Sequence, residues 1–209
     1  MTKSETALWV AISNNNASGL REILDDTPQL ATVSVPSSPW KYEIEEGYPN
    51  LSRPIHFCSL SGRETLLAIL LEFPVDLEAI AFEENKGLTT ALVLAAWEGS
   101  LESCHLLLNA GANPNTCAST ESPLYTAAEH HAWDKVDLLL AHGAKHDVFT
   151  ACICGQLDIV QAEIHAYPLL ADRRSLKRGR TPIEESIAHD CHEITAWLTE
   201  LEGSEVSAS

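Results

Sequence analysis

Apolar residues recur periodically along most of this chain, in segments that are interrupted by small residues and glycines. The two clearest segments are TALVLAAWEGSLESCHLLLNAGANPN over 90–115 and SPLYTAAEHHAWDKVDLLLAHGAKHD over 122–147. Each segment begins with small and apolar residues, which are followed by a short polar stretch. Three consecutive leucines and a Gly-Ala pair come after it. This pattern predicts two helices per segment, each of which buries one face.

The two segments match position by position at an offset of thirty-two residues. Three blocks coincide at this offset, namely Ala95-Ala96 with Ala127-Ala128, Leu106-Leu107-Leu108 with Leu138-Leu139-Leu140, and Gly111-Ala112 with Gly143-Ala144. An internal repeat of this length indicates a stacked array, in which each unit buries its apolar face against its neighbours.

The residue types at the coinciding positions have physical explanations. Small residues let a first helix lie close to its neighbours, and leucines on the second helix fill the seam between repeats. Gly111 and Gly143 follow the leucine-rich helices, where a left-handed residue ends a helix at little steric cost. Ser122-Pro123 and Thr181-Pro182 are predicted helix starts, with a hydroxyl at the cap and proline at the first helical position.

These segments resemble the ankyrin repeat, whose signature runs roughly T-P-L-H-x-A-A-x-x-G-H-x-x-V-V-x-L-L-L-x-x-G-A-D-x-N over about 33 residues. The resemblance extends upstream through Pro54, His56 and Gly62, and downstream through Gly155 and Thr181-Pro182. It implies an all-α ankyrin-repeat solenoid of helix pairs with short β-hairpin fingers. The predicted organisation is one domain over 1–203, with pairs at approximately 6–31, 53–79, 90–115, 122–147, 148–172 and 179–203, and a disordered tail over 204–209.

Two connections are longer than the hairpin that usually links ankyrin repeats. Residues 32–52 contain the alternating stretch WKYEIEEGYPN and are predicted to form an enlarged β-finger. Residues 79–90, AIAFEENKGLTT, are predicted to form a second one. Because long structured connections in a compact array are commonly functional, the binding edge is expected in the N-terminal half.

The resemblance implies that the chain binds a protein partner through exposed inner-helix positions and finger tips. The residues at these positions are Leu60, Ser61, Trp97, Glu98, Glu129, His130, Ile153 and Cys154 on the helices, and Trp40, Tyr42 and Tyr48 on the first finger. Aromatic anchors within a polar rim commonly dominate the energy of an interface. The alternative for Trp97 is that it packs against its own finger.

The adjacent Glu129, His130 and His131 raise the question of a metal or catalytic site. In the repeat register His130 is exposed while His131 replaces the glycine that ends the helix, so the two side chains need not converge on one metal. Cys152 and Cys154 lie about 200° apart on a helix, which prevents joint chelation. No metal, cofactor or enzymatic activity is therefore expected. The alternative function is a small-molecule or catalytic groove that uses Glu98, Glu129 and His130 beside Trp97.

Other histidines and cysteines are expected to be structural. His56 stands at the signature histidine, whose usual role is to hydrogen-bond a neighbouring finger. The six cysteines are too sparse for a disulfide scaffold, so reduced thiols are expected. Cys58 and Cys104 fall on core positions, whereas Cys117 lies on a finger and is the expected exposed thiol.

Charge and composition narrow the class of partner. The chain has 45% hydrophobic residues and carries 13 basic and 30 acidic residues, a net charge of −17, which disfavours nucleic acid and anionic membranes. Two interpretations of the acidic charge stay open: it attracts a basic partner, or it only keeps an elongated protein in solution. A third hypothesis is that an acidic face mimics nucleic acid. It would require the acidic residues to cluster along one face, but they are dispersed along the sequence. The one basic cluster, RRSLKRGR over 173–180, is interpreted as a solvated linker in preference to an acidic-partner or targeting segment. The chain is expected to be a monomer in the cytoplasm, with the nucleus as an alternative location.

Overall fold

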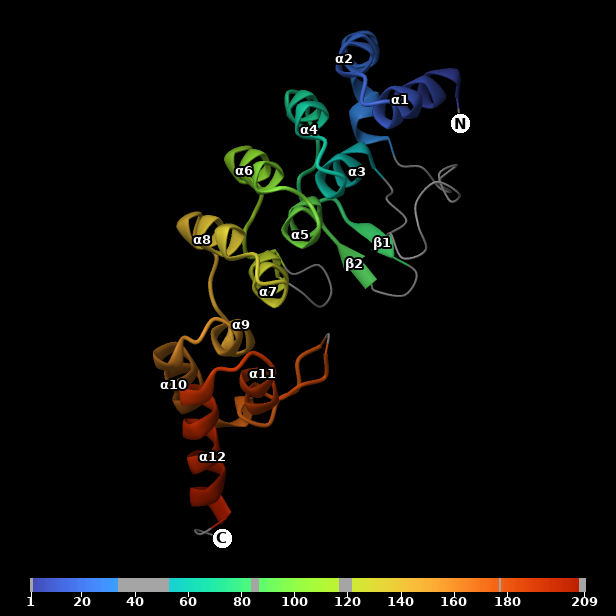
Figure 1. Ribbon diagram of the computed structural model, residues 1–209. Helices are drawn as coiled ribbons and strands as arrows, with labels where there is room; N and C mark the ends of the chain where they lie inside the picture. The colour runs from blue at the N-terminus through green and yellow to red at the C-terminus, as the bar shows by residue number, and fades with distance from the viewer. Residues whose placement is uncertain (1, 34–52, 84–86, 117–121, 177, 207–209) are drawn as a thin grey trace.

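The computed structural model describes residues 2–33, 53–83, 87–116, 122–176 and 178–206. These residues form six consecutive helix pairs that stack in two layers (Figure 1). The inner layer holds α1 (Lys3–Ser13), α3 (Pro54–Leu60), α5 (Ala91–Trp97), α7 (Pro123–Glu129), α9 (Val148–Ile153) and α11 (Pro182–Ala188). The outer layer holds α2 (Ala17–Asp26), α4 (Glu64–Leu71), α6 (Leu101–Asn109), α8 (Trp133–Ala141), α10 (Leu157–Ala166) and α12 (His192–Val206). The predicted all-α solenoid is confirmed.

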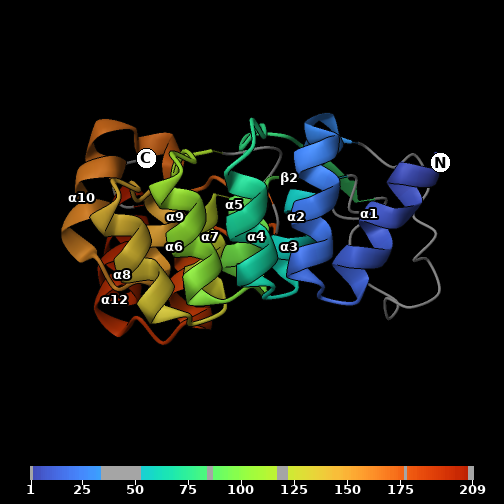
Figure 2. The same ribbon diagram turned by 90° about the horizontal axis from the view of Figure 1, so that it is seen from above.

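Each inner helix from α1 to α11 packs against the next inner helix along the chain. The outer helices from α2 to α10 stand side by side in chain order when the molecule is seen from above (Figure 2). Two short 3₁₀ helices, η1 (Pro28–Thr32) and η2 (Pro168–Leu170), follow α2 and α10. One continuous apolar cluster runs from Leu8 in α1 to Leu198 in α12. No pair closes a core of its own, so the stability of each pair depends on its neighbours.

The helix ends follow the local sequence signals. The Ser122 hydroxyl accepts a hydrogen bond from the Tyr125 amide at 3.0 Å and caps α7. Gly111 and Gly143 take left-handed conformations with φ of +99° and +87°, as predicted for glycines that end helices. His131 takes φ +55° just past the inner helix α7, where Gly62 and Gly155 follow the inner helices α3 and α9 with φ of +61° and +68°, so it does replace a glycine there.

The leucine triplets fill the seam between repeats only in part. Leu107 and Leu139, the middle residues of the two triplets, are completely buried. Leu140, the last residue of the second triplet, is 36% exposed. Three successive residues span about 200° of a helix, so one face cannot bury all of them equally.

One connection between helix pairs forms a β-hairpin, and the last helix is longer than predicted. Strands β1 (Ala81–Glu83) and β2 (Gly87–Thr89) pair antiparallel, with Ala81 opposite Thr89, within the segment predicted as the second finger. The first predicted finger lies outside the described residues except for its first two positions. Helix α12 continues to Val206, so residues 204–206 of the predicted disordered tail are helical. Glutamate has a high helix propensity, so Glu205 favours continuation of the helical backbone hydrogen bonds beyond Gly203.

His56 links the second repeat to the start of the β1–β2 hairpin. Its ring is fully buried, and Nε2 lies 2.8 Å from the carbonyl oxygen of Ala79. Because a carbonyl only accepts, Nε2 carries the proton and donates. The predicted structural role of His56 is confirmed. Burial lowers its pKa to about 4, although the hydrogen bond to Ala79 acts in the opposite direction.

The lowered pKa of His56 predicts a loss of stability in mild acid. The unfolded chain, with a histidine pKa near 6.5, binds a proton that the folded chain does not accept until about pH 4. The contribution of His56 is therefore fully present above pH 6.5 and is lost as the pH falls from there towards 4. We expect the free energy of unfolding to be lower by about 2 kcal/mol at pH 5 than at pH 8 through this group alone.

The measurement is urea denaturation at several pH values between 4.5 and 8 for the wild type and His56→Gln. Glutamine retains a donor for the Ala79 carbonyl but does not titrate. Since other histidines also titrate in this range, the readout is the difference in pH slope between the two proteins. Equal slopes would show that His56 does not cause the acid sensitivity.

Candidate functional site

The C-terminal ends of three neighbouring inner helices bring together most of the predicted partner-binding residues. Trp97 ends α5 and Glu98 caps it, while Glu129 ends α7 and His130 caps it. The rings of Trp97 and His130 lie 6.5 Å apart between centroids. Ser61 caps the adjacent α3 and is exposed, as are Glu98 and His130. We call this line of helix ends, from Ser61 to His130, the inner edge.

Two apolar residues at the predicted exposed positions, Leu60 and Ile153, are buried, so that part of the prediction was wrong. Leu60 is 6% exposed because it packs with Leu94 beneath the partly buried Trp97. Ile153 is 3% exposed and belongs to the main core, and its carbonyl oxygen lies 3.7 Å from the Cys191 sulfur. Large aliphatic side chains at these positions fold onto the neighbouring repeat, because burying them removes apolar surface from water.

The predicted aromatic anchors are the three residues of the first finger and Trp97. Trp40, Tyr42 and Tyr48 lie outside the described residues, and their role in binding stays a prediction. Trp97 packs on one side against the Leu60 and Leu94 pair and is half-buried. A ring held in this way keeps its other surface in a fixed position at the inner edge, which is the property of a binding anchor.

The basic run 173–180 is folded against the repeats, contrary to the interpretation as a solvated linker. It belongs to the connection between η2 and α11, residues 171–181, which we call the strap and which is described apart from residue 177. Arg178 forms an ion pair with Glu129, and Arg174 forms one with Glu184 at 3.1 Å. The Glu129 side chain is only 6% exposed, although it stands at the end of an inner helix. Glu129 is therefore covered by the chain itself.

Beside this contact lies a buried carboxylate, Glu185, which was not among the residues predicted from the sequence. Glu185 of α11 is completely buried and accepts a hydrogen bond from the Tyr125 hydroxyl of α7 at 2.8 Å. Arg180 of the strap donates to its other oxygen at 3.0 Å, and His189 Nε2 lies 3.8 Å away. The side chains of α7 and α11 thus meet across the short helix α9. The clue in the sequence was a basic run next to the pair Glu184 and Glu185.

The electrostatics of this network favour a neutral tyrosine and a neutral histidine. Burial and the hydrogen bond to Glu185 raise the pKa of Tyr125, so its hydroxyl keeps the proton that it donates. Burial lowers the pKa of His189, although the Glu185 carboxylate acts in the opposite direction. The His131 ring lies 5.4 Å from the His189 ring between centroids. The cation that pairs with Glu185 is therefore Arg180.

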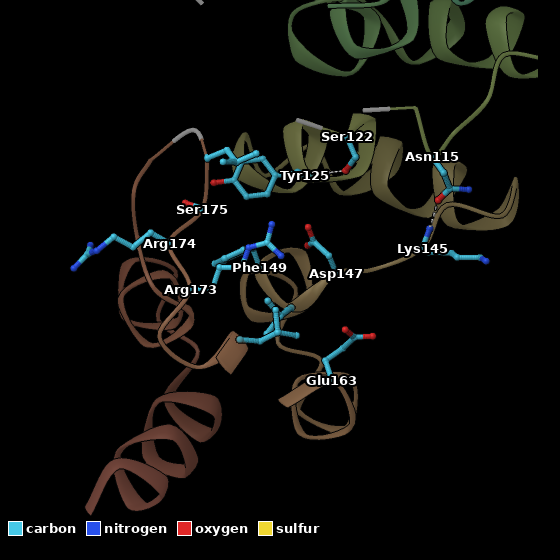
Figure 3. Close-up of a pocket in the computed structure, with 13 residues that line it drawn as sticks. Asn115, Ser122, Tyr125, Lys145, Asp147, Phe149, Glu163, Arg173, Arg174 and Ser175 are labelled. Carbon is cyan, nitrogen blue, oxygen red and sulfur yellow. Dashed lines mark hydrogen bonds between the residues drawn. The ribbon is translucent and has the colours of Figure 1, made fainter. Parts of the chain in front are cut away.

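A cavity of about 330 Å³ lies where the strap faces the beginnings of α7 and α9 (Figure 3). Tyr125 and Phe149 form part of its wall, and charged side chains of both signs reach it, among them Asp147, Glu163 and Arg173. Trp97, Glu98, Glu129 and His130 do not line this cavity. It is therefore separate from the groove that the alternative function would require.

Three of the cysteines in the described ranges, Cys58, Cys104 and Cys152, are buried free thiols. Burial raises the pKa of Cys58 to about 12 and that of Cys104 to about 11, so neither forms a thiolate readily. Cys152 is buried and Cys154 is half-buried, in agreement with the repeat register, while Cys117 lies outside the described residues. Within the described ranges, no three histidine, cysteine or acidic side chains gather in a way that could hold a metal ion.

Comparison with known proteins identifies the repeat. A sequence model of ankyrin repeats in three copies matches residues 55–150, from α3 into α9. No curated protein matches the chain. Among the helices that the structure describes, none is both long and apolar enough to cross a membrane.

Proposed function

We propose that this chain, which belongs to the ankyrin repeat family, is a non-enzymatic adaptor or regulatory scaffold that holds a protein partner at its inner edge. Ankyrin repeats are generally modules for protein–protein interaction. The observation that carries the proposal is the line of exposed or half-exposed side chains at the ends of α3, α5 and α7, with Trp97 beside His130. The first finger would extend this surface.

The rigidity of the inner edge supports the proposal. Trp97 is held by Leu60 and Leu94, and the backbones of Glu98 and His130 are fixed as helix caps. A surface that is already ordered loses little conformational entropy on binding, so more of the contact energy becomes affinity. The net charge of −17 favours a basic partner, because opposite charge accelerates encounter.

The strap supports a binding surface that lies at α3, α5 and α7 and does not extend towards α11. From α7 onwards, α7, α11 and the strap contact one another, through Glu185 and Glu129 among others. The alternative acid–base groove loses support, because Arg178 pairs with the Glu129 carboxylate. A monomeric state and a cytoplasmic location stay predictions.

We expect the double variant Trp97→Ala/His130→Ala to lose its partner in affinity capture from a native cell extract. Truncating an aromatic anchor at the centre of an interface typically costs about 2 kcal/mol or more, which is about a thirtyfold loss of affinity. The measurement is quantitative mass spectrometry of the proteins retained by the wild type and by the variant at mild salt.

The matched control is Trp133→Ala/His142→Ala, which removes the same two residue types from the ends of the outer helix α8. Trp133 is 46% exposed and His142 caps the same helix, so neither change creates a large cavity in the core. The control is expected to retain the partner. A partner lost equally from both variants, or retained by both, would contradict the assignment of the inner edge.

A further inference from the structure

The strap places a guanidinium on a carboxylate of the inner edge. Arg178 lies 49 residues beyond Glu129 in the chain, and its Nε donates to Glu129 Oε1. Glu129 ends α7 next to His130, so this contact is at the border of the proposed binding surface. Arg178 therefore occupies a position that a side chain of the partner would approach.

The two members of this pair differ in their exposure to solvent. The Glu129 side chain is 6% exposed, whereas the Arg178 side chain is 46% exposed. A carboxylate so far removed from water needs a cationic or hydrogen-bonding partner, because burial otherwise penalises its charge. The guanidinium approaches from the solvent side, so a guanidinium from another molecule can reach the same carboxylate.

The rest of the strap is anchored independently of Arg178. The Ser175 amide donates to the Arg180 carbonyl at 2.8 Å, and the Gly179 amide donates to the Ser175 carbonyl at 2.9 Å, so the turn is closed on itself. Arg180 is held by the buried carboxylate of Glu185. Rotation of the Arg178 side chain into solvent would break its contact with Glu129 while this turn and the Arg180 contact stay in place.

We propose that Arg178 is an internal competitor at the inner edge, and that an arginine side chain of the protein partner takes its place on Glu129 during docking. Arginine is the expected residue because the planar guanidinium of Arg178 already fits this carboxylate. The ammonium group of a lysine lacks the planar set of N–H donors that a guanidinium has. This inference rests on the proposed function for the identity of the partner as a protein. The competition itself concerns only Glu129, Arg178 and an incoming guanidinium.

The expected size of the competition follows from the exposure of Arg178. Glu129 is buried but the Arg178 side chain is 46% exposed, so solvent screens part of the attraction, and we expect the internal pair to reduce the affinity for an external guanidinium by about three- to fivefold. Removing Arg178 should recover this factor. The gain should depend on Glu129, since that carboxylate is the group for which the two guanidinium groups compete.

The experiment titrates N-acetyl-arginine amide into the ¹⁵N-labelled chain and follows the backbone amides of residues 97–99 and 129–131 by NMR. The proteins are the wild type, Arg178→Gln, Arg178→Gln/Glu129→Gln and the matched control Arg174→Gln. Arg174→Gln removes the same charge from the same strap, but Arg174 pairs with Glu184 and not with Glu129. N-acetyl-lysine amide is titrated in parallel.

We expect Arg178→Gln to bind the arginine probe about three- to fivefold more tightly than the wild type, Arg174→Gln to match the wild type, and the added Glu129→Gln to cancel the gain. The lysine probe should show a smaller gain. Equal tightening in Arg178→Gln and Arg174→Gln would reduce the effect to net charge and overturn the proposal, as would no tightening at all.

The result separates this inference from the proposed function, because no natural partner is used. If affinity capture identifies a partner at the inner edge while Arg178→Gln binds the probe no better, only the competition is wrong. If Arg178→Gln tightens binding of the probe while capture retains no partner, the competition holds and the adaptor function fails.

Discussion

Replacing Arg180 by alanine is expected to lower the free energy of unfolding by about 3 to 5 kcal/mol, because it removes the cation from a buried carboxylate. Glu185 is completely buried, and Arg180 donates to it at 3.0 Å. The Tyr125 hydroxyl would remain as a donor, but one neutral hydrogen bond does not replace a guanidinium. The measurement is equilibrium urea denaturation of the wild type and the variant at pH 7.5, followed by circular dichroism.

Arg174→Ala is the matched control for this prediction. Its pair with Glu184 has side-chain exposures of 64% and 46%, so the variant should lose less than about 1 kcal/mol. A second test replaces Arg180 and Glu185 together by leucine, which removes the buried charge and should recover much of the stability lost in Arg180→Ala. An Arg180→Ala effect as small as that of Arg174→Ala would mean that water solvates Glu185.

Replacing Gly99 by alanine is expected to lower the free energy of unfolding by about 3 kcal/mol, because the new Cβ would overlap backbone atoms. It would lie 2.6 Å from the Cα of Ala95 and would also collide with the carbonyl oxygen of Ser59 in α3. Neither atom belongs to a flexible side chain, so α3 and α5 would have to move apart. Thermal and urea denaturation would both report the change.

The control is Gly203→Ala in α12, where a Cβ would meet no atom within 4 Å. That substitution should leave stability unchanged or raise it by a few tenths of a kcal/mol, because alanine favours helix more than glycine does. Comparable losses in the two variants would show that the close approach of α3 to Gly99 is not the cause.

Gly99 also shows where the repeat register misleads. It occupies the position of Gly62 and His131, both of which have a positive φ. Gly99 does not, and glycine is needed there because two backbones come close together. Its carbonyl oxygen accepts a hydrogen bond at 2.7 Å from Lys135, whose ammonium group also contacts the carbonyls of Ala95 and Ala96. The same residue type at the same register therefore serves two different purposes.

The candidate site shows the same division between local and long-range information. The register placed Trp97, Glu98, Glu129 and His130 at the ends of adjacent helices, and the structure has them at these ends. It could not indicate that Arg178 would cover Glu129, because that contact spans 49 residues and depends on the course of an irregular strap. It also predicted exposure for Ile153, which is buried.

The sequence by itself determined the helix pairs, their order, the residues that start and end the helices, and the structural role of His56. These features recur with the repeat of about 32 residues. They depend on the spacing of apolar residues, on helix caps and on turn residues within one repeat and its neighbour. Only the tertiary structure decided the burial of Leu60, the contact of Gly99 with α3, and the attachment of the strap to Glu129 and Glu185. Those features depend on which side chains reach across the stacked helices, and the free energy of such contacts is set by burial in the assembled array rather than by any local pattern.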